Sequence, residues 1–239
     1  MDPFYKSRLP ANIAGLVDRI EDFAKREIGV AVDDRPVSLT SPNPDRLASN
    51  VTHESAKILL RSRDVFDPHS VLHELLHIER LWVERIPQLL AKYDYQLASI
   101  TGALENALEH LIIVPREADY GFDPYPYWND TVRRNWDKYP WPDMKDRSVR
   151  RINCLLGWLS ASNLVNDPAV REHVEECLKG EGLFDEAERF RARIAEKLSS
   201  KVQAISTVVR FLKIPRDEVH VVRIDVVNSR PEFIPLPLN

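Results

Sequence analysis

The spacing of apolar residues predicts a chain built mostly of amphipathic helices. A helical period recurs in the segments 11–28, 67–85, 95–113, 150–165, 168–180 and 184–212. Asp67 suits the cap of the second of these helices, and Pro68 suits its first helical position. Pro87 marks its expected end, and Pro115 the expected end of the helix that follows.

Strand signals are short and few. Residues 55–62 (SAKILLRS) form a brief apolar run suited to a strand, and residues 218–227 alternate between apolar and other side chains. Extended pieces are also expected at VAVDD (30–34) and RPVSLTS (35–41), and the Pro-rich tail 230–239 is expected to lie extended along the surface. The pattern predicts an α+β fold that is mostly helical.

The segment 120–142 shows neither period and is rich in prolines and aromatic residues. We expect a long ordered loop there, because aromatic side chains need a surface to pack on. The chain is then expected to divide into a core at 1–145 and a helical part with a late strand at 146–239, packed together as one unit.

The composition is that of an ordinary globular protein, with 239 residues, 44% hydrophobic, 29% charged and a net charge of −4. This mild acidity predicts neither a nucleic acid nor a membrane as partner. There is no charged-then-apolar leader, and no apolar run approaches the roughly 18 residues of a membrane span. Cys154 and Cys177 lack metal-binding spacing and are expected to be reduced thiols. These features favour a soluble, cytoplasmic protein.

The candidate chemistry lies in the helix at 67–85, which contains His-Glu-Leu-Leu-His at residues 73–77. Residues four apart share a helix face, so His73 and His77 can bind one zinc ion, and Glu74 can reach a water beside it. With 7 His and 37 Asp plus Glu, such a pattern arises by chance about 0.03 times in a chain of this composition. The flanking residues are apolar, which predicts a buried helix whose ionisable groups need partners. His69, in the first turn, is expected to be exposed.

Zinc in a catalytic site takes a third protein ligand and keeps one position open. The ligand does not come from an extended His-Glu-x-x-His-x-x-Gly-x-x-His pattern, because Arg80 stands at the glycine position and Val83 at the position of the third histidine. The helix at 95–113 offers Glu105 and Glu109, one turn apart on an otherwise apolar helix, followed by His110. Two acids so placed are typical of a ligand and its supporting carboxylate.

This order of strand, HELLH helix and glutamate-bearing helix, over about residues 50–120, resembles the gluzincins, a branch of the zincin metallopeptidases. The resemblance implies a zincin-like core: a small sheet, an active-site helix and a glutamate helix, here followed by C-terminal helices. It also implies one zinc per chain, held by His73, His77 and Glu105, with Glu109 supporting the first histidine. Leu104 stands where the branch has an asparagine, and the supporting acid is a glutamate, so Glu109 and then His110 stay as alternative ligands.

The resemblance implies peptide hydrolysis by a metal-activated water with Glu74 as general base, on a restricted protein substrate. An oxyanion-stabilising donor is left open among His110, Arg116, Tyr120, Tyr125, Tyr127 and Tyr139. The alternative is a catalytically silent regulatory or protein-binding module, against which the intact Glu74 argues. The helix at 184–212 alternates acids and bases on its outer face and could support a homodimer.

Overall fold

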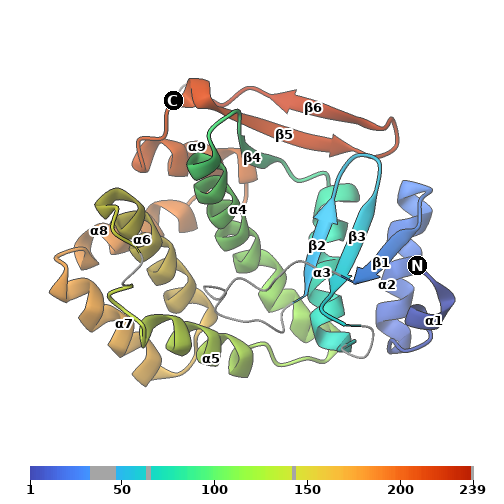
Figure 1. Ribbon diagram of the computed structural model, residues 1–239, viewed down its shortest axis with the longest axis horizontal. Coiled ribbons are helices and arrows are strands. Elements are labelled where there is room, and N and C mark those ends of the chain that lie inside the picture. The colour runs from blue at the N-terminus through green and yellow to red at the C-terminus, as the bar shows by residue number, and fades with distance from the viewer. Residues whose placement is uncertain (33–46, 63–65, 142–143, 238–239) are drawn as a thin grey trace. The chain divides into compact units, whose positions relative to one another are not determined.

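The computed structural model describes residues 1–32, 47–62, 66–141 and 144–237. Helices dominate, and the strands described form two small three-stranded sheets (Figure 1). The predicted fold class, α+β and mostly helical, is therefore confirmed. Residues 35–41, predicted to be extended, lie outside the described residues.

Contacts along the chain divide it into two compact units. Unit 1 comprises Met1–Pro87, Ile113–Asp123 and Val222–Phe233, and unit 2 comprises Gln88–Ile112, Pro124–Val221 and Ile234–Asn239. Both units draw on segments from either side of position 145. The division at 1–145 and 146–239 stays a prediction.

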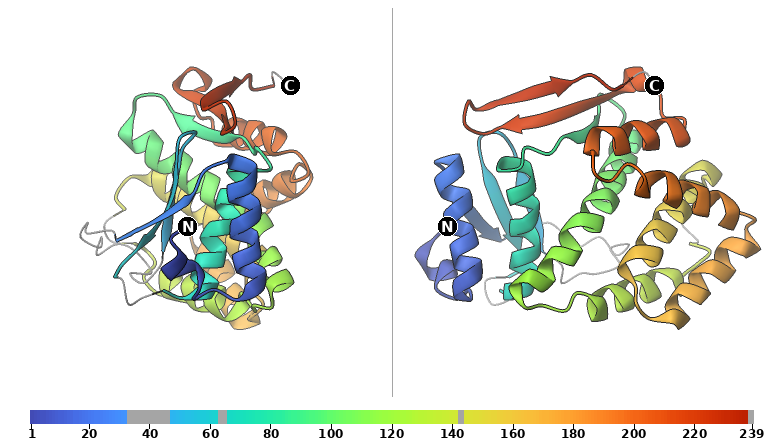
Figure 2. Two further views of the ribbon diagram at one scale, coloured as in Figure 1. Left: turned by 90° about the vertical axis from the view of Figure 1, so that its right-hand side faces the viewer. Right: turned by 180° about the vertical axis from the view of Figure 1, so that it is seen from behind.

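Unit 1 holds the HELLH helix and the first sheet. Its elements begin with α1 (Pro3–Lys6), α2 (Ala11–Ala24), β1 (Ile28–Val32), β2 (Ala48–Val51), β3 (Ala56–Leu60) and α3 (Pro68–Trp82). The sheet has the order β1-β3-β2, with β1 parallel to β3 and β2 antiparallel to it. Helix α3 contacts α2, β2 and β3, an arrangement that can be followed from two further sides in Figure 2.

The core of unit 1 follows from these patterns. Helix α2 buries one apolar stripe and α3 buries apolar side chains on most of its circumference, as its sequence predicted. The Trp82 indole, at the end of α3, donates a hydrogen bond of 2.8 Å to the carbonyl oxygen of Thr52. The predicted strand at 55–62 is confirmed as β3, whereas β2 was not foreseen because Ala48–Val51 is short and half polar.

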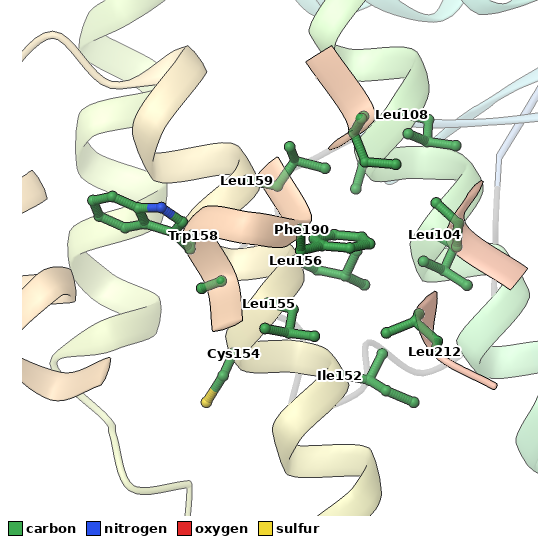
Figure 3. Close-up of a cluster of buried hydrophobic side chains, with 14 of the residues drawn as sticks. Leu104, Leu108, Ile152, Cys154, Leu155, Leu156, Trp158, Leu159, Phe190 and Leu212 are labelled. Atoms are coloured by element: carbon green, nitrogen blue, oxygen red, sulfur yellow. The ribbon is translucent and has the colours of Figure 1, made fainter. Parts of the chain in front are cut away.

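Unit 2 is a helical bundle around one apolar cluster. It contains β4 (Gln88–Ala91), α5 (Tyr125–Trp136), α6 (Arg147–Leu164), α7 (Pro168–Gly180), α8 (Phe184–Ala195), α9 (Lys201–Phe211) and η2 (Arg216–Glu218). Figure 3 shows the cluster, in which Leu104 and Leu108 come from helix α4 (Tyr95–Arg116), and Phe190 from α8, together with residues of α6. Both predicted helices at 150–165 and 168–180 are confirmed as α6 and α7.

In three elements, α4, β5 (Val219–Asp225) and β6 (Arg230–Ile234), the chain passes from one unit to the other. Helix α4 is continuous and is followed directly by η1 (Glu117–Tyr120). Strand β5, which confirms the predicted late strand, leads to β6 in a sheet of order β4-β5-β6. The predicted extended tail is thus in part a strand.

Two segment predictions were wrong. The expected loop at 120–142 contains helix α5, whose buried Trp128, Val132 and Trp136 are spaced four apart. The single helix expected at 184–212 is two helices, because α8 ends at Ala195, the chain turns over residues 196–199, and Ser200 adopts an extended conformation before α9. Serine favours such a position over a helix interior.

The observed ends of the two helices near the motif also differ from the predicted ones. Helix α3 stops at Trp82, a few residues short of the predicted end, and α4 continues to Arg116 through Pro115. Pro115 lies in the last turn, where its missing N–H costs one hydrogen bond, the one to the Leu111 carbonyl.

The stretch Tyr95–Tyr120 is long and apolar enough to cross a membrane by length and composition alone, with a mean hydropathy of 1.3 over an 18-residue window. Half of that window is buried inside the protein, and the stretch carries the buried acids Glu105, Glu109 and Glu117. A core helix passes the same test. The predicted absence of a membrane partner and the cytoplasmic location stay predictions.

Candidate metal centre

Helix α3 positions the motif through a well-formed start. The Asp67 carboxylate accepts a hydrogen bond of 2.7 Å from the Ser70 backbone N–H, and Pro68 opens the helix, as predicted. His73 and Glu74 are buried and His77 is half-buried. The two imidazole rings lie with centroids 5.0 Å apart at 77°, so they project from one face toward a common region.

A buried carboxylate that the sequence did not single out supports the first histidine. Glu117, at the start of η1, is 2% exposed, and its Oε1 lies 2.7 Å from Nδ1 of His73. An ionised carboxylate only accepts hydrogen bonds, so Nδ1 carries the proton. The lone pair of a neutral His73 is then on Nε2, the atom with which an imidazole in this tautomer would bind a metal.

The same carboxylate holds a second histidine. Oε2 of Glu117 lies 2.7 Å from Nε2 of His69, whose side chain is 26% exposed. The prediction that His69 is exposed is therefore only partly met. Burial favours a higher pKa for Glu117, but the hydrogen bonds from His69 and His73 outweigh it and hold its pKa below the ordinary value. The Glu117 hydrogen bond in turn raises the pKa of His69.

Glu74 is anchored by the neighbouring strand. The Ser49 hydroxyl, on β2, donates a hydrogen bond of 2.6 Å to Oε2 of Glu74. This bond fixes one carboxylate oxygen, while Glu74 itself is only 4% exposed. A carboxylate held in this way has a defined orientation beside His73 and His77.

Among the described residues, three histidines form a group that could hold a metal ion. One nitrogen atom each from His73, His77 and His110 lies within 4.8 Å of the others. His110 is on α4, and the continuous helix carries it two turns before Glu117, which is bonded to His73. The edge of the Trp128 ring system packs against the His110 imidazole, with centroids 4.7 Å apart at 62°. His110 was the least favoured of the three candidates for third ligand.

Glu105 and Glu109 are held by a lysine. The Lys201 ammonium lies 3.0 Å from Oε2 of Glu105 and 2.7 Å from Oε1 of Glu109. Oε1 of Glu105 accepts a hydrogen bond of 2.8 Å from the Leu89 backbone N–H. Burial raises the pKa of Glu105, against the influence of Lys201. Glu105 as a zinc ligand, with Glu109 supporting a histidine, stays a prediction, and the structure gives both acids another partner.

The side chains considered as oxyanion donors differ in their partners. The Arg116 guanidinium is bound at 2.6 Å to both Glu79 and Glu84, and the Tyr120 hydroxyl accepts a hydrogen bond of 3.2 Å from Arg19. Tyr139 packs in unit 2 against Trp136 and Trp141. Arg116 is thus engaged in two ion pairs within unit 1, and His110 belongs to the group of three histidines.

Sequence reasoning missed Ser49, Glu117 and the role of His69. Part of the signal was present, because His69, His73 and His77 are spaced four apart and so lie along one face of α3. The partner of the first two could not be identified, since Glu117 is one of many acids and is placed by the end of α4.

No family model, curated protein or solved structure matches this chain.

Proposed function

We propose that this protein is a zinc-dependent metallopeptidase whose metal is bound by His73, His77 and His110. The observation that carries the proposal is the hydrogen bond between His73 Nδ1 and Glu117. A histidine that binds zinc characteristically donates its other N–H to a carboxylate or carbonyl, which fixes the tautomer and the ring. A histidine buried for packing alone would also need a hydrogen-bond partner, but it would not need nitrogen atoms of two further histidines within 4.8 Å.

The donor set fits zinc. Three imidazole nitrogens and an open fourth position are a known catalytic zinc arrangement, with Zn–N distances of about 2.0–2.1 Å. The three nitrogens lie within 4.8 Å of one another, a span that small side-chain rotations can reduce around one ion. Harder cations such as Mg²⁺ and Ca²⁺ prefer oxygen ligands, which this group lacks.

The residues around the group have distinct tasks. Bound zinc would supply Lewis acidity, polarising a carbonyl and lowering the pKa of a water molecule. Glu74 would accept a proton on Oε1, because Ser49 occupies Oε2. Glu117 keeps His73 in the tautomer that presents Nε2, and the burial of Glu74 and His73 excludes bulk water from the proton transfer.

The substrate we propose is a peptide bond in a restricted protein substrate, in the cytoplasm. A general-base carboxylate beside a metal-binding histidine pair is the arrangement with which H-E-x-x-H metallopeptidases hydrolyse peptide bonds. A homodimer stays a further prediction. The competing function, a metal-binding module without turnover, needs the histidines but not Glu74.

The first experiment is elemental analysis of protein purified without chelator. We expect about one zinc per chain in the wild type and in His53→Ala, which removes a histidine of unit 1 that lies 3.9 Å from Glu54. His73→Ala, His77→Ala and His110→Ala should each lose the zinc, and Glu105→Ala should keep it. Loss in Glu105→Ala with retention in His110→Ala would instead make Glu105 the third ligand.

The second experiment tests turnover. A complex peptide mixture is incubated with wild type and with Glu74→Gln, and new termini are identified by mass spectrometry. We expect cleavage by the wild type only, with zinc retained in both proteins. Zinc without cleavage of peptides or of cytoplasmic proteins would favour the silent module, and no zinc after addition of the metal would refute the site.

A further inference from the structure

Glu117 divides its two oxygen atoms between two histidines. Oε1 lies 2.7 Å from His73 Nδ1, and Oε2 lies 2.7 Å from His69 Nε2. Each oxygen of a carboxylate that is 2% exposed is therefore bound by one imidazole. The orientation of the carboxylate depends on both bonds, because either bond alone would let the group rotate about its last torsion.

The outer histidine is itself held in place. The His69 ring stacks on Phe122, with centroids 4.6 Å apart and the planes 12° from parallel. His69 lies one turn before His73 on α3, while Phe122 follows Glu117 just past η1. Two segments of unit 1 thus fix both the ring and the carboxylate that it binds, and the chain of groups runs from the buried His73 to the partly exposed His69.

We infer that His69 is a positioning residue for the metal centre, holding Glu117 in the orientation that aligns His73 with the ion. This inference rests on the proposed zinc site. His69 does not touch the ion; its bond to Oε2 fixes the plane of the carboxylate, and Oε1 then receives the N–H of His73 along a defined direction. A metal ligand oriented by such a partner binds more tightly, because less freedom is lost when the ion enters.

The chain offers a matched set of substitutions at this position. In His69→Gln the amide nitrogen reaches about as far as Nε2 and can still donate to Glu117. In His69→Asn the amide is one methylene shorter and corresponds to Nδ1, which faces away from that oxygen. Both are polar amides, but asparagine has the lower helix propensity, so the unfolding temperatures of the two metal-free variants are compared as well. His53→Ala again controls for loss of a histidine in unit 1.

The test measures the zinc dissociation constant by competition with a chelator at one fixed pH, and the visible absorption spectrum of the cobalt-substituted protein. We expect His69→Asn to weaken zinc binding about 10-fold, at the low end of the range for partners of metal ligands, and to alter the cobalt bands. His69→Gln should restore both to near the wild-type values. A role confined to stability would lower the unfolding temperature of the metal-free protein and leave the spectrum unchanged.

The outcomes separate the two proposals. Wild type that binds zinc, together with His69→Asn of equal affinity and an identical cobalt spectrum, refutes the positioning role and leaves the metallopeptidase intact. Failure of His69→Gln to restore what His69→Asn loses also counts against it. Wild type that binds no zinc removes both the site and the role.

Discussion

Two buried carboxylate clusters in this protein use the same kind of acid for different ends. In unit 2, Glu105 and Glu109 share the ammonium of Lys201. In unit 1, Glu117 is shared by His69 and His73. In both places burial disfavours the ionised carboxylate. The imidazoles outweigh this at Glu117, whose pKa is lowered, whereas Lys201 only opposes it at Glu105, whose pKa is raised.

The two clusters differ in whether the nitrogen partner keeps a lone pair that could bind a metal. A lysine ammonium has three donors and no lone pair, so Lys201 itself cannot bind a metal. A neutral imidazole that donates from Nδ1 keeps a lone pair on Nε2, so the cluster around Glu117 can pass its orienting effect to an ion. The partner of a buried acid, more than the acid itself, distinguishes a structural ion pair from a candidate site.

The largest expected effect on stability comes from removing Lys201, the cation shared by Glu105 and Glu109 in unit 2. Lys201→Met leaves two buried carboxylates without their shared cation, and we expect a loss of about 3–5 kcal/mol in the free energy of unfolding. Zinc content per folded chain should not change. Chemical denaturation and elemental analysis check both points, with Lys138→Met, an exposed lysine of the same unit, as a control expected to change stability by less than about 0.5 kcal/mol. Loss of zinc with unaltered stability would reverse the assignment of the two clusters.

The next effect compares the same substitution in both clusters. Glu117→Gln should weaken zinc binding by about 10–100-fold, because an amide orients the imidazole of His73 less strongly than a carboxylate. Glu105→Gln should leave the zinc dissociation constant unchanged, since its partners are Lys201 and Leu89. Chelator competition measures both. A larger loss in Glu105→Gln than in Glu117→Gln would return Glu105 to the role that the sequence predicted.

The smallest effect concerns pH and the metal-free protein. The folded-state pKa of His69 is raised above its ordinary value of 6.5, so its bond to Glu117 stabilises the fold fully below that value and is lost as pH rises through the raised pKa. The pKa of Glu117 is lowered from 4.5, so its share is present above that value and is lost as pH falls through the lowered pKa. Asp67 and Asp123 also favour the charged form of His69.

We therefore expect the stability difference between wild type and His69→Asn to be greatest between about pH 4.5 and 6.5 and to shrink toward pH 9. The difference should not exceed about 1 kcal/mol for a partly exposed pair, or about 2–4 °C in a chain of this size. Thermal unfolding over this pH range, in the presence of chelator, gives the profile. A difference that grows with pH would contradict the charge assignment of the pair.

Local sequence patterns predicted many of the helices and strands and about half of the residues of the candidate site. The cap at Asp67, Pro68 and the apolar periods located α3, α6 and α7, because these depend on neighbours in the chain. HELLH gave His73, Glu74 and His77 for the same reason. Helix α5 was missed although Trp128, Val132 and Trp136 show the period, since the surrounding prolines outweighed it.

The remaining site residues depend on contacts between distant segments. Glu105 was preferred over His110 because two acids one turn apart look like a ligand and its support. Lys201, which forms ion pairs with both acids, lies on another helix, so the local pattern does not reveal it. Ser49 and Glu117 likewise reach α3 only through the folding of unit 1.

The position of Trp82 has a practical consequence for optical measurements. Of the five tryptophans in the chain, Trp82 alone belongs to unit 1, where its indole is fully buried and bonded to the Thr52 carbonyl. Trp128, Trp136, Trp141 and Trp158 all belong to unit 2. With those four replaced by phenylalanine, the emission of the protein would come from the last turn of the HELLH helix. Loosening of that helix in denaturant could then be followed as a red shift of this single fluorophore, independently of what happens in the bundle.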